Sequence, residues 1–391
     1  MNIWSLIGEF FETSGIAGFF QNGGWANLVM ILVGIFFLVL ALVFKFEPYL
    51  LIPISFGIIL TNIPGGHIFV HDTETGQYSG LLGVLYYGVK FEIYPCLIFL
   101  GIGATTDFGP LIANKKTMLL GAAAQVGIFA AFFLAIALGF NGFEAASIGI
   151  IGGADGPTAI LVSNKMLSAS ASESSLSLLA PIALAAYSYM ALVPVIFPPI
   201  IRLFTTKKER SIKMEQLREV TKREKILFPI IVTLVVALIV PGATPLIGCL
   251  MLGNLIKESG IVPNLVNTIA NSLLYICTIL LGLSVGATAQ GSSFLTPQTL
   301  MIFGLGIGAF VLAGTFGLLG GKLMCAITKG KVNPMIGIAG VSAVPMAARV
   351  VQREGQKEDP SNFLLMHAMG PNVSGVIGSA IAAGILMAIF L

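Results

Sequence analysis

Long apolar stretches alternate with short polar ones along the chain, and their lengths predict about ten transmembrane helices. A full crossing takes about 20 residues. The expected spans are 26–44, 49–62, 81–101, 117–139, 176–203, 226–240, 243–256, 265–285, 299–325 and 363–390. Three of these, 49–62, 226–240 and 243–256, are shorter than a full crossing, so they are expected to be tilted, broken or only partly inserted.

Two further apolar stretches, 145–163 and 335–350, are interrupted by glycine and proline, which predicts re-entrant hairpins rather than clean crossings. The first contains Gly152-Gly153-Ala154-Asp155-Gly156-Pro157-Thr158. Lipid offers no hydrogen bonds to broken backbone, so such a segment must be buried in protein or line a wet cavity. A carboxylate at membrane depth costs about 2.5–3.5 kcal/mol. Asp155 therefore indicates an ion or proton site; the alternative is a solvated loop whose aspartate caps a helix.

Composition supports an all-α polytopic membrane protein. The chain is 56% hydrophobic and 10% charged, whereas soluble domains carry about 25% charged residues. Its 46 glycines suit helices that pack backbone to backbone, and Gly304-x-x-x-Gly308 and Gly317-x-x-x-Gly321 fit that pattern. The net charge of +3 gives no indication of nucleic-acid binding. The four cysteines show no metal-binding spacing and are expected to be reduced core residues.

Charge placement predicts the orientation in the membrane. Segment 205–225 holds eight Lys or Arg residues and four acids, which indicates a cytoplasmic linker. Loops 63–80 and 140–144 contain no Lys or Arg and are expected outside, so ten spans alternate with both termini external. Residues 1–25 are expected to form an interfacial segment, because Met1–Gln21 has no basic residue and therefore lacks the charge of a signal peptide.

The chain also repeats itself. Ordered matches relate a first repeat, 26–204, to a second, 226–391, and each repeat holds five spans and one hairpin. The odd number of spans makes the second copy inverted, an arrangement that places two broken elements face to face near the membrane midplane. The matched pairs are Pro53 and Pro245, Asn62 and Asn254, Gly103 and Gly286, Pro157 and Pro345, and Pro181 and Pro371.

Polar residues should converge where the two hairpins meet. Carboxylate, amide, hydroxyl and freed carbonyl oxygens together suit a hard cation, so Na⁺ is the natural ligand, and H⁺ can compete for Asp155. Asn333 and Asn372 each adjoin a proline, where helix geometry is broken; the alternative for each is a cap or turn residue. The candidates from the two hairpins and the spans that follow them are Asp155, Thr158, Tyr187, Ser188, Tyr189, Asn333, Gly337, Ser342, Arg349, Asn372 and Ser374.

The sequence leaves the roles of three other ionisable residues undecided. Arg349, the one basic residue of the second hairpin, could bind a carboxylate through its guanidinium fork or extend toward the cytoplasmic edge. Asp107 could be a second ion ligand, or equally a cap or ion pair near the cytoplasm. Glu92 lies within an expected span and its role is undecided. His67, His71 and His367 are too dispersed to form a site.

Three strings resemble the beta subunit of the sodium-pumping biotin-dependent decarboxylases, which serve oxaloacetate, methylmalonyl-CoA and glutaconyl-CoA decarboxylases. They are Gly152–Thr158, Val341–Val350 and Met366–Val373, and the similarity runs from about residue 46 to the C-terminus. The resemblance implies a fixed scaffold with a mobile, elevator-like core, a homotrimer, and a place in the bacterial cytoplasmic (inner) membrane.

The resemblance also implies an activity: decarboxylation of carboxybiotin with export of Na⁺ and uptake of a proton. It implies a biotin carrier, a carboxyltransferase alpha subunit and a small membrane anchor as partner subunits. The chain has no Met-Lys-Met motif, so biotin must be carried on another subunit. In the family pattern, Asp155, Asn333, Gly337, Ser342 and Asn372 match the Na⁺ site. Arg349 matches the carboxybiotin site, and the functional tyrosine is Tyr187 or Tyr189.

Other functions fit part of the pattern. A secondary Na⁺-coupled organic-anion transporter would explain the inverted repeats, the hairpins and Arg349. A Na⁺/H⁺ antiporter would explain Asp155 and leave Arg349 without a role. The sequence identifies neither the acid that is decarboxylated upstream nor the Na⁺ stoichiometry.

Overall fold

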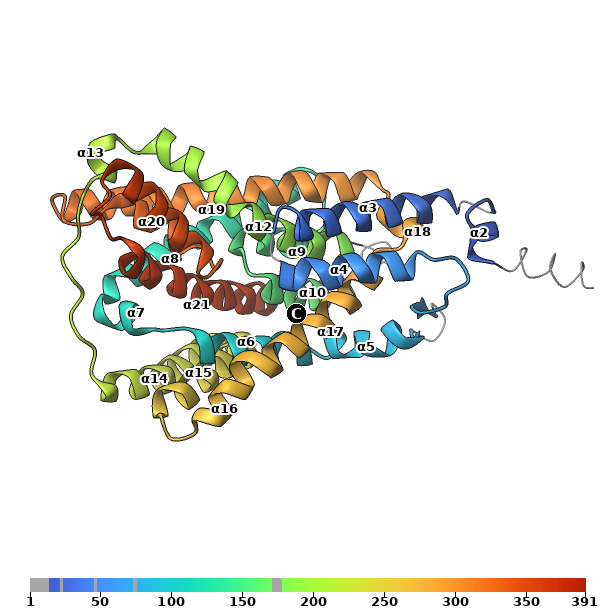
Figure 1. Ribbon diagram of the computed structural model, residues 1–391, viewed down its shortest axis with the longest axis horizontal. Coiled ribbons are helices and arrows are strands. Elements are labelled where there is room, and N and C mark those ends of the chain that lie inside the picture. The colour runs from blue at the N-terminus through green and yellow to red at the C-terminus, as the bar shows by residue number, and fades with distance from the viewer. Residues whose placement is uncertain (1–13, 22–23, 46–47, 73–75, 171–177) are drawn as a thin grey trace, which may run out of the picture.

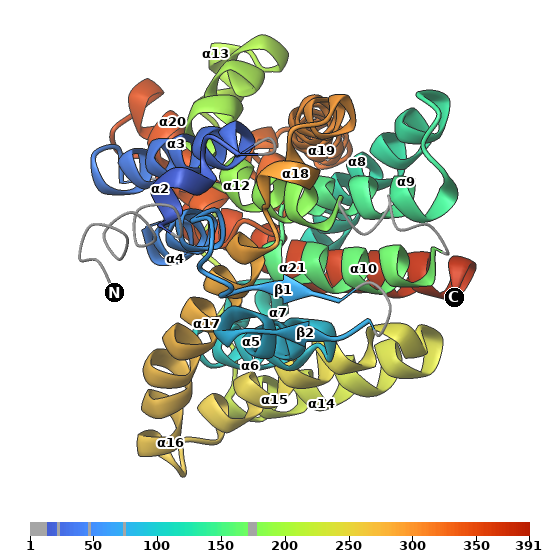
Figure 2. The ribbon, with the colours of Figure 1, turned by 90° about the vertical axis from the view of Figure 1, so that its right-hand side faces the viewer.

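The computed structural model describes residues 14–21, 24–45, 48–72, 76–170 and 178–391, and helices dominate this part of the chain (Figure 1). The longest helices lie along the long axis of the molecule. One small antiparallel hairpin, β1 (Val70–His71) and β2 (Tyr78–Ser79), lies at one end and faces the viewer in Figure 2. The short helix α2 (Gly15–Gly18) belongs to the expected interfacial segment, most of which lies outside the described residues.

Five helical stretches of the described chain are long and apolar enough to cross a membrane, or up to seven if each bent helix pair counts as one span. This confirms an all-α, multi-pass membrane protein, while the count of ten stays a prediction. The five are α3 (Trp25–Leu42), η1 (Lys115–Thr117) with α8 (Met118–Ala137), α16 (Pro263–Asn267) with η4 (Thr268–Leu273) and α17 (Leu274–Ala287), α19 (Pro297–Ile327) and α21 (Leu365–Phe390).

The remaining expected spans are short, bent or charged at one end. Helix α12 (Leu179–Phe204) is bent by 62° between its two halves. Among the short helices, α4 has 14 residues and α15 has 16, whereas α14 begins with the charged sequence Lys-Arg-Glu-Lys. These helices are α4 (Pro48–Thr61), α14 (Lys222–Ile239) and α15 (Thr244–Ser259). The short η3 (Pro241–Ala243) joins α14 to α15.

The expected continuous span 81–101 is a broken one. It consists of α5 (Leu81–Lys90) and α6 (Ile93–Thr105), which meet at a 64° bend. Glu92 stands at the break in the left-handed conformation, with φ of +65°, which ends a helix. Its carboxylate lies 2.8 Å from Nζ of Lys165. The structure therefore gives Glu92, whose role the sequence left undecided, an ion-pair partner.

The two glycine- and proline-interrupted stretches each consist of helical segments joined by a short break, and they are called here the first and the second hairpin; that they are re-entrant in the membrane stays a prediction. The first consists of α9 (Gly142–Gly149), η2 (Ile150–Gly153) and α10 (Gly156–Ala169). The second consists of η5 (Pro334–Gly340) and α20 (Met346–Glu358). Their tips touch, because the backbone N–H of Ser342 donates to the carbonyl of Gly153 at 3.1 Å. Helices α8 and α19 pack against each other and against both tips.

Glycines explain how closely the second hairpin approaches α19. A Cβ on Gly317 would lie 2.5 Å from the carbonyl oxygen of Gly337, and a Cβ on Gly337 would lie 2.8 Å from the backbone nitrogen of Gly321. The motif Gly317-x-x-x-Gly321 thus packs against the second hairpin. The other motif faces open space, since a Cβ on Gly304 or Gly308 would meet no described atom within 4 Å.

Two asparagines make matching contacts in the two halves of the chain. Asn62 at the end of α4 donates to the carbonyl of Ala289 at 2.8 Å, and Asn254 of α15 donates to the carbonyl of Thr106 at 3.4 Å. The offset from Asn62 to Asn254 is 254 − 62 = 192, and that from Thr106 to Ala289 is 289 − 106 = 183. The second offset equals that between Gly103 and Gly286. Likewise α4 packs on α17 while α6 packs on α15.

Segment 205–225 is held against the second hairpin. After the single turn of α13 (Lys207–Arg210) it runs extended to α14, along the left side of Figure 1. The side-chain amide of Asn333, at the start of η5, donates to the carbonyls of Arg210 and Ile212 at 3.0 and 2.9 Å. Asn362 donates to the same two carbonyls at 3.2 and 3.3 Å. The basic linker is therefore fastened to the base of the second hairpin.

Candidate functional site

Asp155 lies at the tip of the first hairpin and is only 6% exposed, which excludes the solvated loop. Its Oδ2 accepts 2.8 Å hydrogen bonds from the hydroxyls of Thr158 and Ser379. Its Oδ1 accepts one long bond, 3.5 Å, from the backbone N–H of Thr158. Asp155 thus caps α10, as the alternative interpretation held, and it is also a buried carboxylate with one oxygen free of short hydrogen bonds from the described residues.

Ser342 lies in the same cavity as this carboxylate, and Asn372 contacts the backbone on both sides of Ser342. Ser342 and Asp155 both line a cavity of about 470 Å³, and the Ser342 hydroxyl is buried without a hydrogen-bond partner among the described residues. The Asn372 amide donates to the carbonyls on either side of Ser342, those of Val341 at 2.7 Å and Ala343 at 3.4 Å. Its Oδ1 is buried and has no described partner. The structure therefore brings Asp155 and Ser342 into one cavity, whereas Asn372 is connected to them through the backbone around Ser342 and is not among the described residues that line the cavity.

The structure separates the two candidate tyrosines. Tyr187 packs against Gly156, where any Cβ would overlap its ring, and its hydroxyl is buried without a described partner. The Tyr189 hydroxyl donates to the carbonyl of Phe303 at 2.6 Å, and its ring packs edge-on against Phe310. Tyr187 therefore adjoins the Asp155 turn, and Tyr189 points toward α19.

Three other candidates lie away from the Asp155 carboxylate. Asn333 is fully buried, and its amide nitrogen donates to carbonyls of the linker. Its side-chain oxygen accepts a hydrogen bond from the backbone N–H of Met335 at 3.0 Å. Gly337 faces the backbone of α19. Arg349 is exposed on α20 and has no ion-pair partner among the described residues. None of the three is among the described residues that line the cavity. Their roles at an ion site stay predictions.

Two polar residues of the site were missed by the sequence interpretation. Ser379 bonds directly to Asp155, and Gln125 of α8 donates to the carbonyl of Gly375 at 3.3 Å while its own oxygen has no described partner. Ser379 follows Asn372 by seven residues, which places both on one face of α21. That spacing was a usable signal. Gln125 stood alone in an apolar span, and no local signal related it to the hairpins.

The free oxygens define what the site can bind. A buried polar atom without a partner costs about 1–3 kcal/mol, so several in one place indicate a ligand that satisfies them. The Asp155 Oδ1, the Ser342 and Tyr187 hydroxyls and the Asn372 Oδ1 are all oxygens. Oxygen-only sets suit hard cations. The described residues contain no cluster of three or more His, Cys, Asp or Glu that could hold a metal ion, so hydroxyl and amide oxygens would have to complete such a shell.

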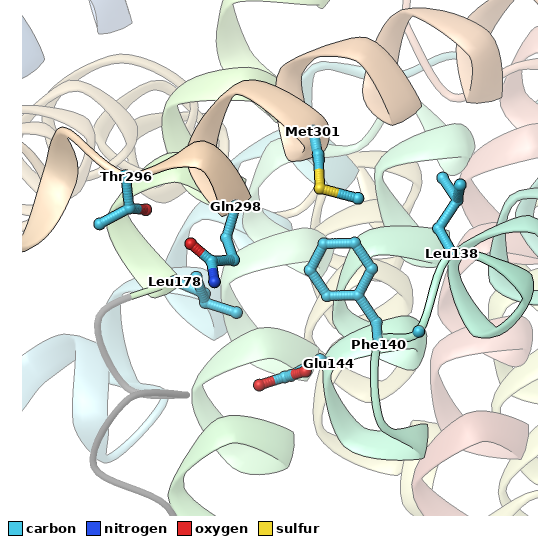
Figure 3. A pocket seen from close by; sticks show the side chains of 8 residues that line it. Leu138, Phe140, Glu144, Leu178, Thr296, Gln298 and Met301 are labelled. Carbon is cyan, nitrogen blue, oxygen red and sulfur yellow. The ribbon is translucent and has the colours of Figure 1, made fainter.

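A second cavity, of about 460 Å³, lies at the other end of the first hairpin, between the α8–α9 turn and the start of α19 (Figure 3). Phe140, Met301 and Gln298 line it together with Glu144. Glu144 accepts the backbone N–H of Asn141 at 3.2 Å in a capping box. The Glu144 carboxylate caps the N-terminus of α9. The helices α9 and η2 lie between Glu144 and Asp155 in the chain, so this cavity is separate from the Asp155 site.

The fold and the site define a multi-pass membrane protein with a buried carboxylate in a largely apolar cavity. The family model described as "Na+-transporting oxaloacetate decarboxylase beta subunit" matches residues 26–390. The chain belongs to this family of membrane subunits of Na⁺-translocating decarboxylases.

Named relatives cover nearly the whole chain. It is 54% identical to the methylmalonyl-CoA decarboxylase subunit beta of Propionigenium modestum, over 98% of both chains. It is 55% identical to the glutaconyl-CoA decarboxylase subunit beta of Acidaminococcus fermentans, over 93% of both. It is 47% identical to the oxaloacetate decarboxylase beta chain 2 of Salmonella typhi, over 93% of this chain and 95% of that one.

Proposed function

We propose that Asp155, Ser342, Asn372 and Tyr187 bind Na⁺ as it crosses the membrane, at the point where the two hairpin tips meet. The observation that carries the proposal is the buried Asp155 carboxylate, whose Oδ1 lacks a short hydrogen bond from the described residues and which shares a cavity with the Ser342 hydroxyl, itself without a described partner. The Tyr187 hydroxyl and the Asn372 Oδ1 also lack described partners; Tyr187 adjoins the Asp155 turn, and Asn372 contacts the backbone around Ser342. Thr158 and Ser379 orient that carboxylate through its other oxygen. The hydrogen bond from Ser342 to Gly153 makes binding at one hairpin sensitive to the position of the other.

Na⁺ transport is coupled to the decarboxylation of carboxybiotin, which a separate carrier subunit delivers. The bond between the ureido nitrogen and the carboxyl carbon breaks, CO₂ leaves, and the electron pair returns to the nitrogen, which takes up one proton. Na⁺ arriving at Asp155 repels the proton of the neighbouring Tyr187 or Ser342 hydroxyl toward that nitrogen, and a proton from outside replaces it. Arg349, an exposed cation on the second hairpin, holds the carboxylate before the bond breaks.

The same proposal includes the finer architecture. Ten spans in two inverted repeats carry a mobile core, with the two hairpins, past a scaffold in an elevator-like motion. The matching contacts of Asn62 and Asn254 support the repeats. The subunit works as a homotrimer in a bacterial inner membrane, with a biotin carrier, a carboxyltransferase and a small anchor subunit. A secondary organic-anion transporter is not favoured, because the chain belongs to a decarboxylase family.

Reconstitution tests this function. The complex with its carrier subunit, placed in proteoliposomes, is expected to release CO₂ from carboxybiotin only when Na⁺ is present, and to move ²²Na⁺ across the membrane in step with that release. The controls are vesicles with K⁺ in place of Na⁺ and vesicles with uncarboxylated carrier. CO₂ release at the same rate without Na⁺, or release with no movement of ²²Na⁺, would overturn the proposal.

The two tyrosines provide a paired prediction. Tyr187→Phe removes a hydroxyl beside the Asp155 turn, and Na⁺-dependent CO₂ release is expected to fall about 100-fold, the smaller of the usual effects for loss of a proton-transfer group. Tyr189→Phe removes only the bond to the Phe303 carbonyl. It is expected to lower stability by about 1 kcal/mol and to leave the Na⁺ dependence unchanged. Initial rates across a Na⁺ titration check both, and equal effects would contradict the assignment of Tyr187.

A further inference from the structure

A large cavity lies beneath the basic linker, on the side expected to be cytoplasmic. Its volume is about 760 Å³, which lies within the range of small-molecule sites. The linker, α7 (Gly109–Ala113) and the start of α21 enclose it. Apolar side chains from these elements, including Met214, Val220 and Phe363, form part of its lining together with Lys225 and His367.

Two nitrogen-bearing side chains of this cavity have no short hydrogen bond from the described residues. His367 is 7% exposed, and its Nδ1 is buried without a partner. The ammonium of Lys225 lies 3.7 Å from the Asp107 carboxylate and 3.8 Å from that of Glu258, both beyond hydrogen-bond distance. A buried ring nitrogen without a partner is costly, so a ligand that makes a hydrogen bond at this point would be favoured.

Arg218, the other cation that lines the cavity, is already engaged. Both terminal nitrogens of Arg218 bond to the Glu224 carboxylate, at 3.1 and 2.7 Å, and one also donates to the carbonyl of Ile112 at 3.2 Å. This pairing lowers the pKa of Glu224 to about 2, mainly through its bonds to Arg218. Arg218 therefore fixes the linker in place, whereas Lys225 and His367 lack short hydrogen bonds from the described residues.

The cavity adjoins the Asp155 site. Asp107 lines both this cavity and the 470 Å³ cavity that contains Asp155 and Ser342. Its Oδ1 accepts the backbone N–H of Gly109 at 2.9 Å, which holds the carboxylate at the common wall. A molecule entering beneath the linker thus lies next to the compartment where the cation would bind.

We propose that this cavity is the receiving site for a carboxylated cyclic urea on a flexible arm, with Lys225 and His367 binding its carboxylate and ureido oxygens. The assignment rests on the proposed function, which supplies carboxybiotin as the substrate. The apolar wall formed by Met214, Val220 and Phe363 suits the sulfur-containing ring and the alkyl arm. Arg349 then acts later, when the group has moved toward the hairpin tips.

Steady-state kinetics of the complex test the site, with the carboxylated carrier subunit as the varied substrate. Lys225→Ala and His367→Leu are each expected to raise KM for the carrier about 10-fold, the usual loss for a hydrogen bond to a charged group, while half-saturation by Na⁺ stays unchanged. Lys225→Arg and His367→Asn should restore most of the affinity. Lys222→Ala is the matched control, because Lys222 is exposed on the same helix and does not line the cavity.

A labelling measurement gives a second readout that does not depend on turnover. A cysteine introduced by Phe363→Cys should react with a maleimide more slowly when carboxylated carrier is present at saturation. Unchanged KM in both variants, or labelling that the carrier does not slow, would overturn the cavity assignment alone. If the unaltered complex shows no Na⁺-dependent decarboxylation, the proposed function fails, and the ligand assigned to the cavity fails with it.

Discussion

Asp155→Asn is expected to abolish Na⁺-dependent decarboxylation while the subunit still folds and assembles. The change keeps the side-chain shape, and its oxygen can still accept the hydroxyls of Thr158 and Ser379. It removes the negative charge that the cation needs in a buried site. Loss of one such preorganised group typically lowers a rate by about 10²–10³-fold. CO₂ release measured across a Na⁺ titration, with size-exclusion chromatography of the complex, checks the result.

Glu144→Gln is the matched control for that experiment, because it removes a carboxylate from the start of the same hairpin, at the far end of α9 from Asp155. Glutamine can retain the capping role at this position, so Na⁺ dependence is expected to stay within twofold of the unaltered complex. An Asp155→Asn complex that remains coupled to Na⁺ would reject Asp155 as the ion ligand. An Asp155→Asn protein that fails to assemble would show that the carboxylate supports folding instead.

Gly337→Ala is expected to have the largest effect on folding. An added Cβ would meet the backbone of α19 at Gly317 and Gly321, and backbone atoms cannot rotate away. Overpacking of this kind costs about 1–3 kcal/mol, and it would displace the hairpin that carries Ser342. Lower yield of monodisperse protein and a lower unfolding temperature in detergent are the expected observations.

The comparison for this variant is Gly304→Ala on the same helix, where a Cβ would meet no described atom within 4 Å. Helix propensity favours alanine over glycine, so this variant should be as stable as the unaltered protein or slightly more stable. Equal behaviour of Gly337→Ala and Gly304→Ala would contradict the close packing of the second hairpin on α19.

The centre of the site was predictable from the sequence because its signals are local. A carboxylate among glycines and a proline, inside an apolar stretch, identified Asp155, and proline-adjacent breaks identified the segments that carry Ser342 and Asn372. The structure places Asp155 and Ser342 in one cavity and Asn372 against the backbone next to Ser342, and their role as ion ligands stays a prediction. Ser379 was missed, although its spacing from Asn372 on one helix face was available in the sequence.

Long-range contacts decided the parts that could not be predicted. No residue near Tyr187 or Tyr189 in the sequence indicates which of them adjoins Asp155. In the structure Tyr187 packs against Gly156 and Tyr189 bonds to the Phe303 carbonyl, and both contacts join residues that are distant in the sequence. The bend at Glu92 could not be predicted either, because the largely apolar stretch 81–101 has the length of one straight transmembrane helix. Glu92 pairs with a lysine 73 positions later (165 − 92 = 73), a contact that no periodicity reveals.

Asn333 shows the limit of interpretation from proline-adjacent breaks. Its position beside Pro334 fitted an ion ligand and a turn residue equally well, and its buried amide is used to hold the linker. The linker backbone at Arg210 and Ile212 is more than 120 positions away in the sequence, which fixes this use only in three dimensions.

Asn333 and Asn362, the two asparagines that bond to the linker, also connect the surface of the protein to the second hairpin. Four side-chain hydrogen bonds join the segment around Arg210 to the base of the hairpin whose tip bears Ser342. When this hairpin is displaced, either the linker moves with it or all four hydrogen bonds break. If the proposed cation binding moves this hairpin, the surface around the linker changes with it, and the affinity of a subunit that docks there becomes linked to cation occupancy.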